Sequence, residues 1–280
     1  MSALLEARSV TKRFGGLVAV KDVDLSVDQG EVVGLIGPNG AGKTTFFNCL
    51  TGMESPTAGS VTFRGAPLPS RPDLVTKSGV ARTFQNIRLF RNMTALENVV
   101  VGRHVRTRGG VLSAVGHGPR FHREERESEQ TARELLEFVG LSRVGNELAK
   151  NLPYGDQRRL EIARALATDP GLLLLDEPTA GMNPAETSAT VALVKAIQAR
   201  GTAVVLIEHD MRFVFGLCDR VAVLVQGQLL TEGSPTQVQS DDRVIAAYLG
   251  RPEGAAEPHA DADLPTPPET EPPGDGQEQS

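Results

Sequence analysis

The sequence predicts an α/β fold, in which parallel strands are buried and functional side chains follow their carboxyl ends. Two apolar runs carry this prediction: residues 32–36 read Val-Val-Gly-Leu-Ile, and residues 172–175 are four consecutive leucines. The first run leads into a glycine-rich turn and a helix start, and the second is followed directly by two acids. Short apolar runs of this kind are typical of buried strands, and ligands of open α/β sheets lie beyond the carboxyl ends of the strands.

The turn after the first run has the pattern Gly-x-x-x-x-Gly-Lys-Thr, which is typical of a loop that holds the phosphates of a nucleoside triphosphate. Glycines bring backbone N–H groups close to the phosphates, and a helix starting at Lys43 directs its positive end at the same anion. We expect Lys43 to reach the outer phosphates and Thr44 to bind Mg²⁺. A glycine-rich surface turn is the alternative, but strand, loop, Lys-Thr and helix in this order favour nucleotide binding. The predicted nucleotide-binding residues in this loop are Gly37, Pro38, Asn39, Gly40, Ala41, Gly42, Lys43, Thr44 and Thr45.

Asp176 and Glu177 follow the four leucines. A buried strand cannot hold carboxylates without partners, so both acids should emerge at its carboxyl end. We predict that Asp176 binds Mg²⁺ and that Glu177 orients or deprotonates an attacking water. Because Pro178 and Thr179 come next, an acid pair at a helix N-terminus is the alternative.

A third segment, residues 152–166, is a short glycine-bearing turn that leads into an amphipathic helix. With it the chain resembles the nucleotide-binding subunit of ABC transporters, whose signature sequence most commonly reads Leu-Ser-Gly-Gly-Gln. Gln85 in Arg-Thr-Phe-Gln and His209 in Ile-Glu-His-Asp fit the same family. The D-loop position of that family is occupied by Ala180, Gly181, Met182 and Asn183. These motifs occur in the order of the family.

The resemblance implies a P-loop NTPase fold of the ABC type, with a RecA-like core, an antiparallel β lobe and a helical lobe at about residues 78–165. It also implies that two such domains meet head to tail, with ATP between the phosphate loop of one and the signature turn of the other. His209 then contacts the γ-phosphate or the water, and Gln85 contacts Mg²⁺ and the water. Phe14 matches the aromatic residue that stacks on adenine, although it could instead be a core residue. The signature turn, which acts on the partner's nucleotide, comprises Pro153, Tyr154, Gly155 and Asp156.

Three positions depart from the pattern of the family. Pro153 stands where the signature usually has Ser, so only backbone donors remain there. Asp156 replaces Gln, and we expect its side chain to point away from the nucleotide. Asn183 replaces the usual Asp of the D-loop, and with Pro184 and Glu186 it forms the pattern of a capped helix start.

Composition agrees with one ATPase domain at residues 1–250 and a tail at 251–280. The 280 residues are 40% hydrophobic, without an apolar run near the roughly eighteen residues of a membrane helix. We therefore expect a peripheral protein on the cytoplasmic face of the inner membrane, linked to it through partners. Two cysteines fit a reducing compartment, and the five histidines show no metal-ligand spacing. The expected cofactors are ATP and Mg²⁺.

The tail is acidic and rich in proline. Residues 251–280 hold eight acids and one arginine of a chain whose net charge is −6, which leaves residues 1–250 near +1. Such a tail should be disordered, either as a solvated spacer or as an acidic interaction segment. The near-neutral body gives no electrostatic footprint for nucleic acid, so we expect no nucleic-acid partner.

Along the body, we expect strands within 4–27 and at 60–63, 203–207 and 221–225, with a hairpin turn at Gln226-Gly227. Thr94 and Glu97 form a capping pattern that predicts a helix start in a helical region at about 78–140. The glycine-rich, basic stretch 102–123 suggests an insertion between helices. Residues that could contact a membrane partner's short helix, or pack in the core instead, are Ile87, Leu89, Phe90 and Met93.

The strings 14–20, 82–90, 152–164 and 247–250 look like those of the branched-chain amino acid importer ATPase. Similar ATPases serve urea import and lipopolysaccharide export, so these solutes stay open. The implied partners are a second ATPase subunit, identical or not, two transmembrane permease subunits and, indirectly, an extracytoplasmic solute-binding protein. A soluble ABC ATPase is the alternative of another class, but the segment between residues 85 and 152 is too short for a long coiled coil.

Overall fold

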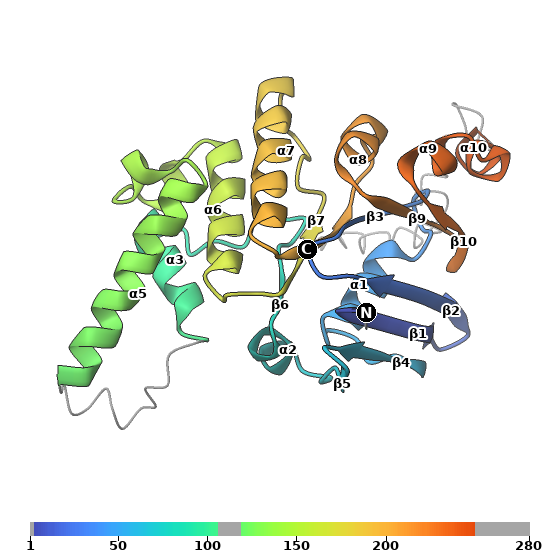
Figure 1. The fold of residues 1–280 in the computed structure, drawn as a ribbon, viewed down its shortest axis with the longest axis horizontal. Helices are drawn as coiled ribbons and strands as arrows, with labels where there is room; N and C mark the ends of the chain where they lie inside the picture. Colours follow the sequence, from blue (N-terminus) through green and yellow to red (C-terminus); the bar gives the residue numbers. More distant parts are fainter. Residues whose placement is uncertain (1–2, 106–118, 250–280) are drawn as a thin grey trace, which may run out of the picture.

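The structure is a computed structural model and describes residues 3–105 and 119–249. Its strands form two sheets: six strands in the order β10-β9-β3-β8-β7-β6, and four in the order β2-β1-β4-β5 (Figure 1). The larger sheet contains β3 (Val32–Ile36), β6 (Val80–Arg82), β7 (Leu172–Asp176), β8 (Ala203–Ile207), β9 (Arg220–Val225) and β10 (Gln228–Gly233). The smaller sheet contains β1 (Leu5–Phe14), β2 (Leu17–Val27), β4 (Ala58–Phe63) and β5 (Ala66–Pro67).

The larger sheet confirms the predicted α/β fold. Its strands pair in parallel from β9 through β3, β8 and β7 to β6, and β10 joins β9 antiparallel. Every residue of β3, β7 and β8 is buried, because both faces of the sheet are covered. The predicted strands at 32–36 and 203–207 have the observed bounds, and the leucine strand extends by one residue to include Asp176.

The two faces of this sheet pack against different layers. Leu172 and Leu174 point towards Phe46 and Phe47 of α1 (Lys43–Leu50), which lies between the two sheets (Figure 1). The alternate strand residues, such as Leu173, join the other hydrophobic cluster. That cluster includes residues of α7 (Pro184–Ala199) and α8 (Met211–Leu217). The alternation fixes which strand residues reach the helix that follows the phosphate loop.

The β9–β10 hairpin closes through Gln226 and Gly227, as predicted. Their φ angles of 49° and 79° are both positive, which is the requirement of the type I′ turn favoured in two-residue hairpins. The backbone of Gly227 also bonds away from its own hairpin. Its N–H donates to the carbonyl oxygen of Ala41 at 3.0 Å, and its carbonyl oxygen accepts from the N–H of Lys21 at 2.8 Å. The turn is therefore joined to the glycine-rich loop and to β2.

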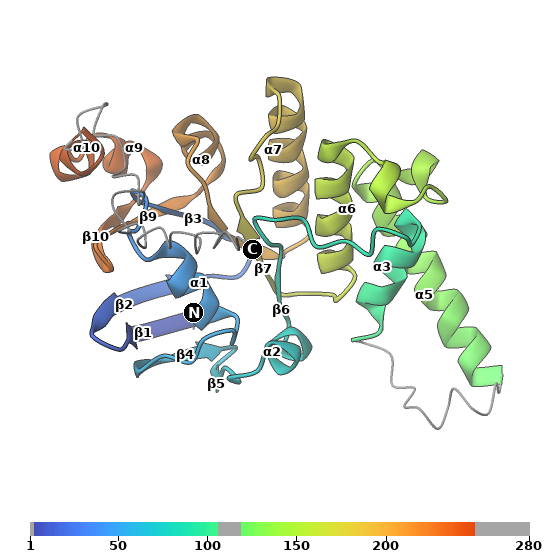
Figure 2. The ribbon, with the colours of Figure 1, turned by 180° about the vertical axis from the view of Figure 1, so that it is seen from behind.

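A helical region lies at one end of the molecule, as Figures 1 and 2 show from opposite sides. It contains α3 (Ala95–Arg103), α5 (Pro119–Phe138), α6 (Tyr154–Leu166) and two short 3-10 turns, Ser142–Val144 and Ala149–Asn151. Before it come α2 (Pro72–Ser78) and β6, and because β6 belongs to the larger sheet, this part of the expected helical segment lies in the core. The expected insertion at 102–123 is helical at both described ends, in α3 and α5, and its middle lies outside the described residues.

Two predicted helix starts carry reciprocal caps. At the start of α3 the Thr94 hydroxyl accepts from the N–H of Glu97, whose carboxylate accepts from the N–H of Thr94 at 2.7 Å. At the start of α7, Asn183 and Glu186 make the equivalent pair of bonds, with Pro184 at the first helical position. Both capping patterns are confirmed, and each satisfies donors that a helix start otherwise leaves free.

The described chain ends with α9 (Pro235–Gln239) and α10 (Asp242–Leu249), at the end of the molecule opposite α5 (Figure 1). Cys49 and Cys218 are buried free thiols. Among the described residues, no helix is both long and apolar enough to cross a membrane. The predicted tail, residues 251–280, lies outside the described residues.

Candidate active site

The glycine-rich loop joins β3 to α1, and the helix begins at Lys43, as predicted. Glycine is required at two positions of this loop. A β-carbon on Gly37 would lie 2.0 Å from the carbonyl oxygen of Leu224, and one on Gly42 would lie 2.4 Å from that of Ala19. Gly42 is the N-cap and offers no side chain, so N–H groups of the first helical turn stay available to an anion.

The Lys43 side chain is folded back onto its own loop. Its ammonium donates to the carbonyl oxygens of Gly37 at 2.6 Å and Pro38 at 3.0 Å. Burial lowers the pKa of Lys43, and the negative charges of Glu177 and Asp176 act in the opposite direction. A cation held by loop carbonyls at this position is placed to bind an anion that enters the loop.

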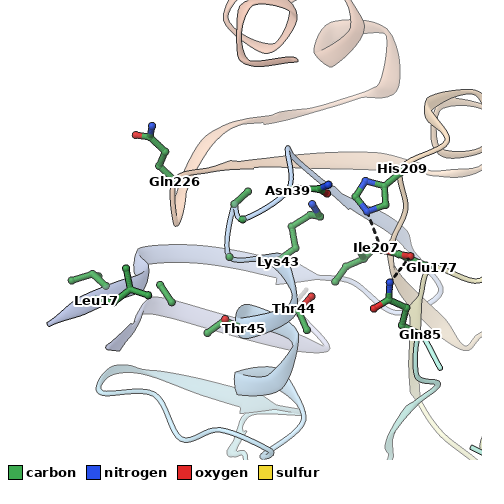
Figure 3. Close-up of a pocket in the computed structure, with 15 residues that line it drawn as sticks. Leu17, Asn39, Lys43, Thr44, Thr45, Gln85, Glu177, Ile207, His209 and Gln226 are labelled. Atoms are coloured by element: carbon green, nitrogen blue, oxygen red, sulfur yellow. Dashed lines mark hydrogen bonds and ion pairs between the residues drawn. The ribbon is translucent and has the colours of Figure 1, made fainter. Parts of the chain in front are cut away.

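Gln85, Glu177 and His209 come together at the carboxyl edge of the larger sheet (Figure 3). Glu177 accepts from the Gln85 amide at 2.9 Å through one oxygen, and its other oxygen lies 2.9 Å from Nε2 of His209. The three residues follow β6, β7 and β8, which are adjacent parallel strands, so their carboxyl ends deliver the side chains to one place. Glu177 has a φ of 48°, a strained conformation that is uncommon for residues with side chains and recurs at functional sites.

These groups share one open cleft of about 680 Å³ with the loop. Figure 3 shows Lys43 and Thr44 facing the Glu177 group across it, and Leu17 and Gln226 at the far end. The cleft is lined by Leu17, Val18, Ala19, Asn39, Gly40, Ala41, Gly42, Lys43, Thr44, Thr45, Gln85, Glu177, Ile207, His209 and Gln226.

Phe14 lies near the far end of this cleft without lining it. Its side chain is 44% exposed at the end of β1, with the Lys12 ammonium 4.9 Å from the ring centre. In the described structure the walls here come instead from Leu17, Val18 and Gln226, which sequence reasoning did not assign to the site. The signal that could have found the first two is their place directly after the Phe-Gly-Gly turn at 14–16.

Asp176 ends β7 as predicted, and it is almost fully buried. Its carboxylate forms an ion pair with Arg82, in which Nη2 donates to Oδ2 at 2.7 Å. Sequence reasoning missed Arg82. The available signal was a basic residue directly before the Thr-Phe-Gln string. A positively charged side chain that is buried at a strand end requires an acidic partner.

The four signature residues lie at the start of α6 and are not among the lining residues of the cleft in the described structure. Pro153 is the N-cap and has no side-chain donor or acceptor, while Tyr154 is 45% exposed. Asp156 forms an ion pair with Arg159 on the same helix. A β-carbon on Gly155 would lie 2.7 Å from Oε1 of Glu186, so this turn packs directly on the start of α7.

The D-loop residues form a tight turn beside the signature turn. The N–H of Ala180 bonds the carbonyl of Glu177 at 3.2 Å, and the N–H of Met182 bonds that of Thr179 at 3.0 Å. Gly181 has a φ of 75°, and a β-carbon there would lie 3.5 Å from the ring of Tyr154. Asn183 caps α7. The loop therefore connects Glu177 to the surface that carries the signature residues.

A buried ion pair that sequence reasoning missed joins α6 to the segment around Gln85. Arg158 is 0% exposed and donates to the carbonyl oxygens of Phe84 at 2.6 Å and Gln85 at 2.7 Å, and to Glu161 at 3.0 Å. Burial raises the pKa of Glu161, and the backbone N–H of Arg88 and the charge of Arg158 oppose this shift. The i,i+3 spacing of two opposite charges in an amphipathic helix was the only sequence signal.

The cleft combines a loop of backbone donors, a lysine, and a carboxylate held by an amide and an imidazole. These groups suit the transfer of a phosphoryl group to water, which requires charge stabilisation and an oriented nucleophile rather than covalent chemistry by the protein.

Comparison with known proteins agrees with this chemistry. Residues 20–180 match the family model described as ABC transporter, so the chain belongs to the ABC transporter family and carries its ATP-binding cassette. Residues 228–254 match a second model, described as branched-chain amino acid ATP-binding cassette transporter. The chain is 47% identical over 249 residues to the high-affinity branched-chain amino acid transport ATP-binding protein LivG of Salmonella typhimurium, which covers 88% of this chain and 98% of that protein.

Solved structures agree as well. A nucleotide-free ATP-binding cassette from an ABC transporter superposes with a TM-score of 0.78 at 31% identity, covering 89% of this chain and 100% of that one. A dimeric bacterial ABC transporter cassette superposes with a TM-score of 0.70 at 29% identity, covering 82% of this chain and 98% of that one. The fold expected from the resemblance is thus confirmed.

Proposed function

We propose that this chain is the ATP-hydrolysing subunit of an importer for branched-chain amino acids. The placement of Glu177 carries the hydrolytic part, because this carboxylate is held between Gln85 and His209 across the cleft from the phosphate loop. The 47% identity to LivG and the match of residues 228–254 support the solute class. Urea import and lipopolysaccharide export remain the alternatives that the experiment below separates.

In this mechanism Lys43 exchanges its bonds to the loop carbonyls for the outer phosphates of ATP. The N–H groups at the start of α1 bind the same phosphates, and Glu177 takes a proton from the attacking water. His209 lies beside Glu177 and orients it towards the water and the γ-phosphate. Gln85 holds the other oxygen of Glu177, so both hydrogen bonds fix the base before the substrate enters.

The donor set beside the loop fits Mg²⁺. Thr44, Asp176 and Gln85 present a hydroxyl, a carboxylate and an amide oxygen, and Mg²⁺ is bound by oxygen ligands together with substrate phosphates. The Gln85 amide nitrogen faces Glu177, which leaves its oxygen for another partner. Bound Mg²⁺ supplies neutralisation of the phosphate charge, and these three residues would hold it.

We further propose that two such chains, identical or related, meet head to tail with ATP between them. The exposed Tyr154 and the free helix start of α6 lie outside their own cleft, where a second chain can use them. The similarity to a dimeric cassette supports this arrangement. In it, the signature turn acts on the partner's nucleotide.

The membrane partners in this proposal are two permease subunits, which hold the chain at the cytoplasmic face of the inner membrane, and a solute-binding protein acts through them. Of the four apolar residues considered for this contact, Leu89 packs against the hydrophobic core and Ile87 is half-buried. Phe90 and Met93 are 47% and 37% exposed, so they are the available surface. Phe90 lines a groove of about 280 Å³ between the larger sheet and α6.

The test is uptake of labelled leucine and labelled urea by cells in which this chain is replaced by its Glu177→Gln form, with redundant importers removed. The matched control is Glu137→Gln, on an exposed position of α5. Loss of leucine uptake only in the Glu177 variant supports the proposal. Loss of urea uptake alone moves the chain to a urea importer, and unchanged uptake of both, with lipopolysaccharide lost from the outer surface, moves it to export.

A further inference from the structure

Arg82 is a buried cation at the edge of the proposed Mg²⁺ site. We propose that it is a positioning residue, which holds Asp176 and the helix carrying Thr44 in register so that both can bind Mg²⁺. This inference rests on the proposed function, because it assumes that these two residues are Mg²⁺ ligands. The side chains of Arg82 and Asp176 are each only 6% exposed.

The guanidinium of Arg82 connects three elements. From the end of β6 it donates through Nη2 to Asp176 at 2.7 Å, at the end of β7. Through Nη1 it donates to Oδ1 of Asn48 at 2.7 Å and to the hydroxyl of Thr51 at 3.3 Å, both near the end of α1. Its planar fork makes these bonds in fixed directions, which a lysine ammonium does not do.

Aromatic packing restricts the guanidinium further. It lies 5.6 Å from the ring centre of Phe47 and 5.3 Å from that of Phe84. Its Nε is buried without a hydrogen-bond partner. These contacts hold the guanidinium in one position, so it can fix the positions of the groups that it bonds.

Asn48 connects Arg82 to the helix that carries Thr44, the second proposed Mg²⁺ ligand. It lies four residues after Thr44 in α1, so the two side chains share one face of the helix. Arg82 therefore bonds Asp176 directly, and through its bond to Asn48 it contacts the face of α1 that carries Thr44. The distance between the two proposed Mg²⁺ ligands is thus set through one side chain.

The bond from Arg82 reaches only Oδ2 of Asp176, and within the described residues Oδ1 makes no hydrogen bond. Oδ1 is therefore the oxygen left for the metal. A neighbouring positive charge alone would weaken the attraction of Asp176 for Mg²⁺. The opposing effect is larger, because without Arg82 the buried carboxylate has no ion-pair partner among the described residues and is free to rotate.

The experiment measures the Mg²⁺ requirement apart from nucleotide affinity. It uses the purified full-length chain in a Glu177→Gln background, so that hydrolysis does not consume the ATP. Binding of a fluorescent ATP analogue is measured in EDTA, and ATP-driven dimerisation is then titrated with Mg²⁺. The variants are Arg82→Met, which keeps an unbranched stem and removes the guanidinium with its charge, and Arg82→Lys. The matched control is Arg71→Met, which breaks the exposed ion pair to Asp73.

We expect Arg82→Met to raise the Mg²⁺ concentration at half-saturation by about 10- to 100-fold, as for the loss of groups that orient metal ligands. Arg82→Lys should raise this concentration less. Nucleotide binding in EDTA should stay within about twofold of the parent, because it is measured without the metal. The Mg²⁺ requirement of the Arg71→Met control should also stay within about twofold of the parent, because its ion pair is exposed. A general structural defect would weaken nucleotide binding in EDTA as well as raise the Mg²⁺ requirement, and that result in a folded chain would overturn the inference. Unchanged Mg²⁺ dependence in a folded Arg82→Met chain overturns the inference.

A second variant keeps the inference testable if Arg82→Met does not fold. Asn48→Ala leaves the bond to Asp176 and removes the shorter of the two bonds to α1, so that only the 3.3 Å bond to Thr51 remains. It should raise the Mg²⁺ requirement by roughly threefold or more. An unchanged requirement in this variant overturns the link to the Thr44 face. If the ATP-driven dimerisation of the parent shows no response to Mg²⁺, the proposed Mg²⁺ site fails, which differs from failure of the Arg82 role alone.

Discussion

Replacing Arg158 by methionine should destabilise the fold far more than replacing Arg159, its neighbour on α6. Arg158 is 0% exposed and Glu161 1% exposed, so removing the arginine leaves an uncompensated carboxylate in the interior. Breaking a buried ion pair in this way costs about 3–5 kcal/mol. The carbonyl oxygens of Phe84 and Gln85 also lose their donors. We therefore place the loss at about 3–5 kcal/mol or slightly above, since hydrogen bonds add about 1 kcal/mol each.

For a domain of this size, 1 kcal/mol shifts the melting temperature by about 2–4 °C, so Arg158→Met should melt about 6–20 °C lower. Arg159→Met loses a half-exposed ion pair to Asp156 and a 3.3 Å bond to the carbonyl of Val139, and it should melt within a few degrees of the parent. Thermal unfolding followed by circular dichroism measures both. Equal melting temperatures for the two variants would refute the role assigned to the buried pair.

The pH dependence of stability gives a second test of the Arg158→Met variant. Burial already raises the pKa of Glu161, and loss of the Arg158 charge removes one of the effects that oppose this shift. A carboxyl whose pKa is higher in the folded than in the unfolded state binds protons more tightly when folded, so its contribution to stability grows as the pH falls. The deficit of Arg158→Met should therefore be smaller near pH 5 than near pH 8. A deficit that grows on acidification would contradict this assignment.

Three further changes test the site. Glu177→Gln should lower ATP hydrolysis by about 100-fold or more while ATP binding persists, because the water loses its base. Size exclusion with ATP should then show a trapped dimer, and a chain that stays monomeric counts against the head-to-tail model. Lys43→Ala should abolish nucleotide binding in a filter assay, because the cation nearest the loop is lost, and a signal equal to the parent would exclude the proposed phosphate site. Gly155→Ala should push Glu186 out of its capping box and lower the free energy of unfolding by about 1 kcal/mol. Gly216→Ala, where a β-carbon meets nothing within 4 Å, should not, and matching melting temperatures for the two would show that the turn does not depend on this packing.

Local signals in the sequence predicted much of the fold. The leucine strand, the phosphate loop and the capping boxes at Thr94 and Asn183 each depend on residues within a few positions of one another. Glu177 was predicted from its place directly after the leucine strand, whereas Gln85 and His209, which lie far from it in the chain, were predicted through the family resemblance. Their approach follows from the parallel order of the strands that precede them.

The remaining features depend on tertiary contacts. Arg82 meets Asp176 across 94 positions of sequence, and no periodic pattern indicates that pairing. The strand Val80–Arg82 has three residues, too few to show the alternation of a strand. Gln226 reaches the cleft only because the β9–β10 hairpin folds back against the glycine-rich loop.

That hairpin has a practical consequence for anyone who engineers this chain. Tips of two-residue hairpins usually tolerate inserted tags, reporter domains or new chain ends, because they contact little else. Here the backbone of Gly227 is bonded to Ala41 and Lys21, so an insertion would pull on the phosphate loop itself. In the turn between β4 and β5, a β-carbon on Gly65 would meet nothing within 4 Å, so this turn is the better place for a fluorophore or an affinity tag.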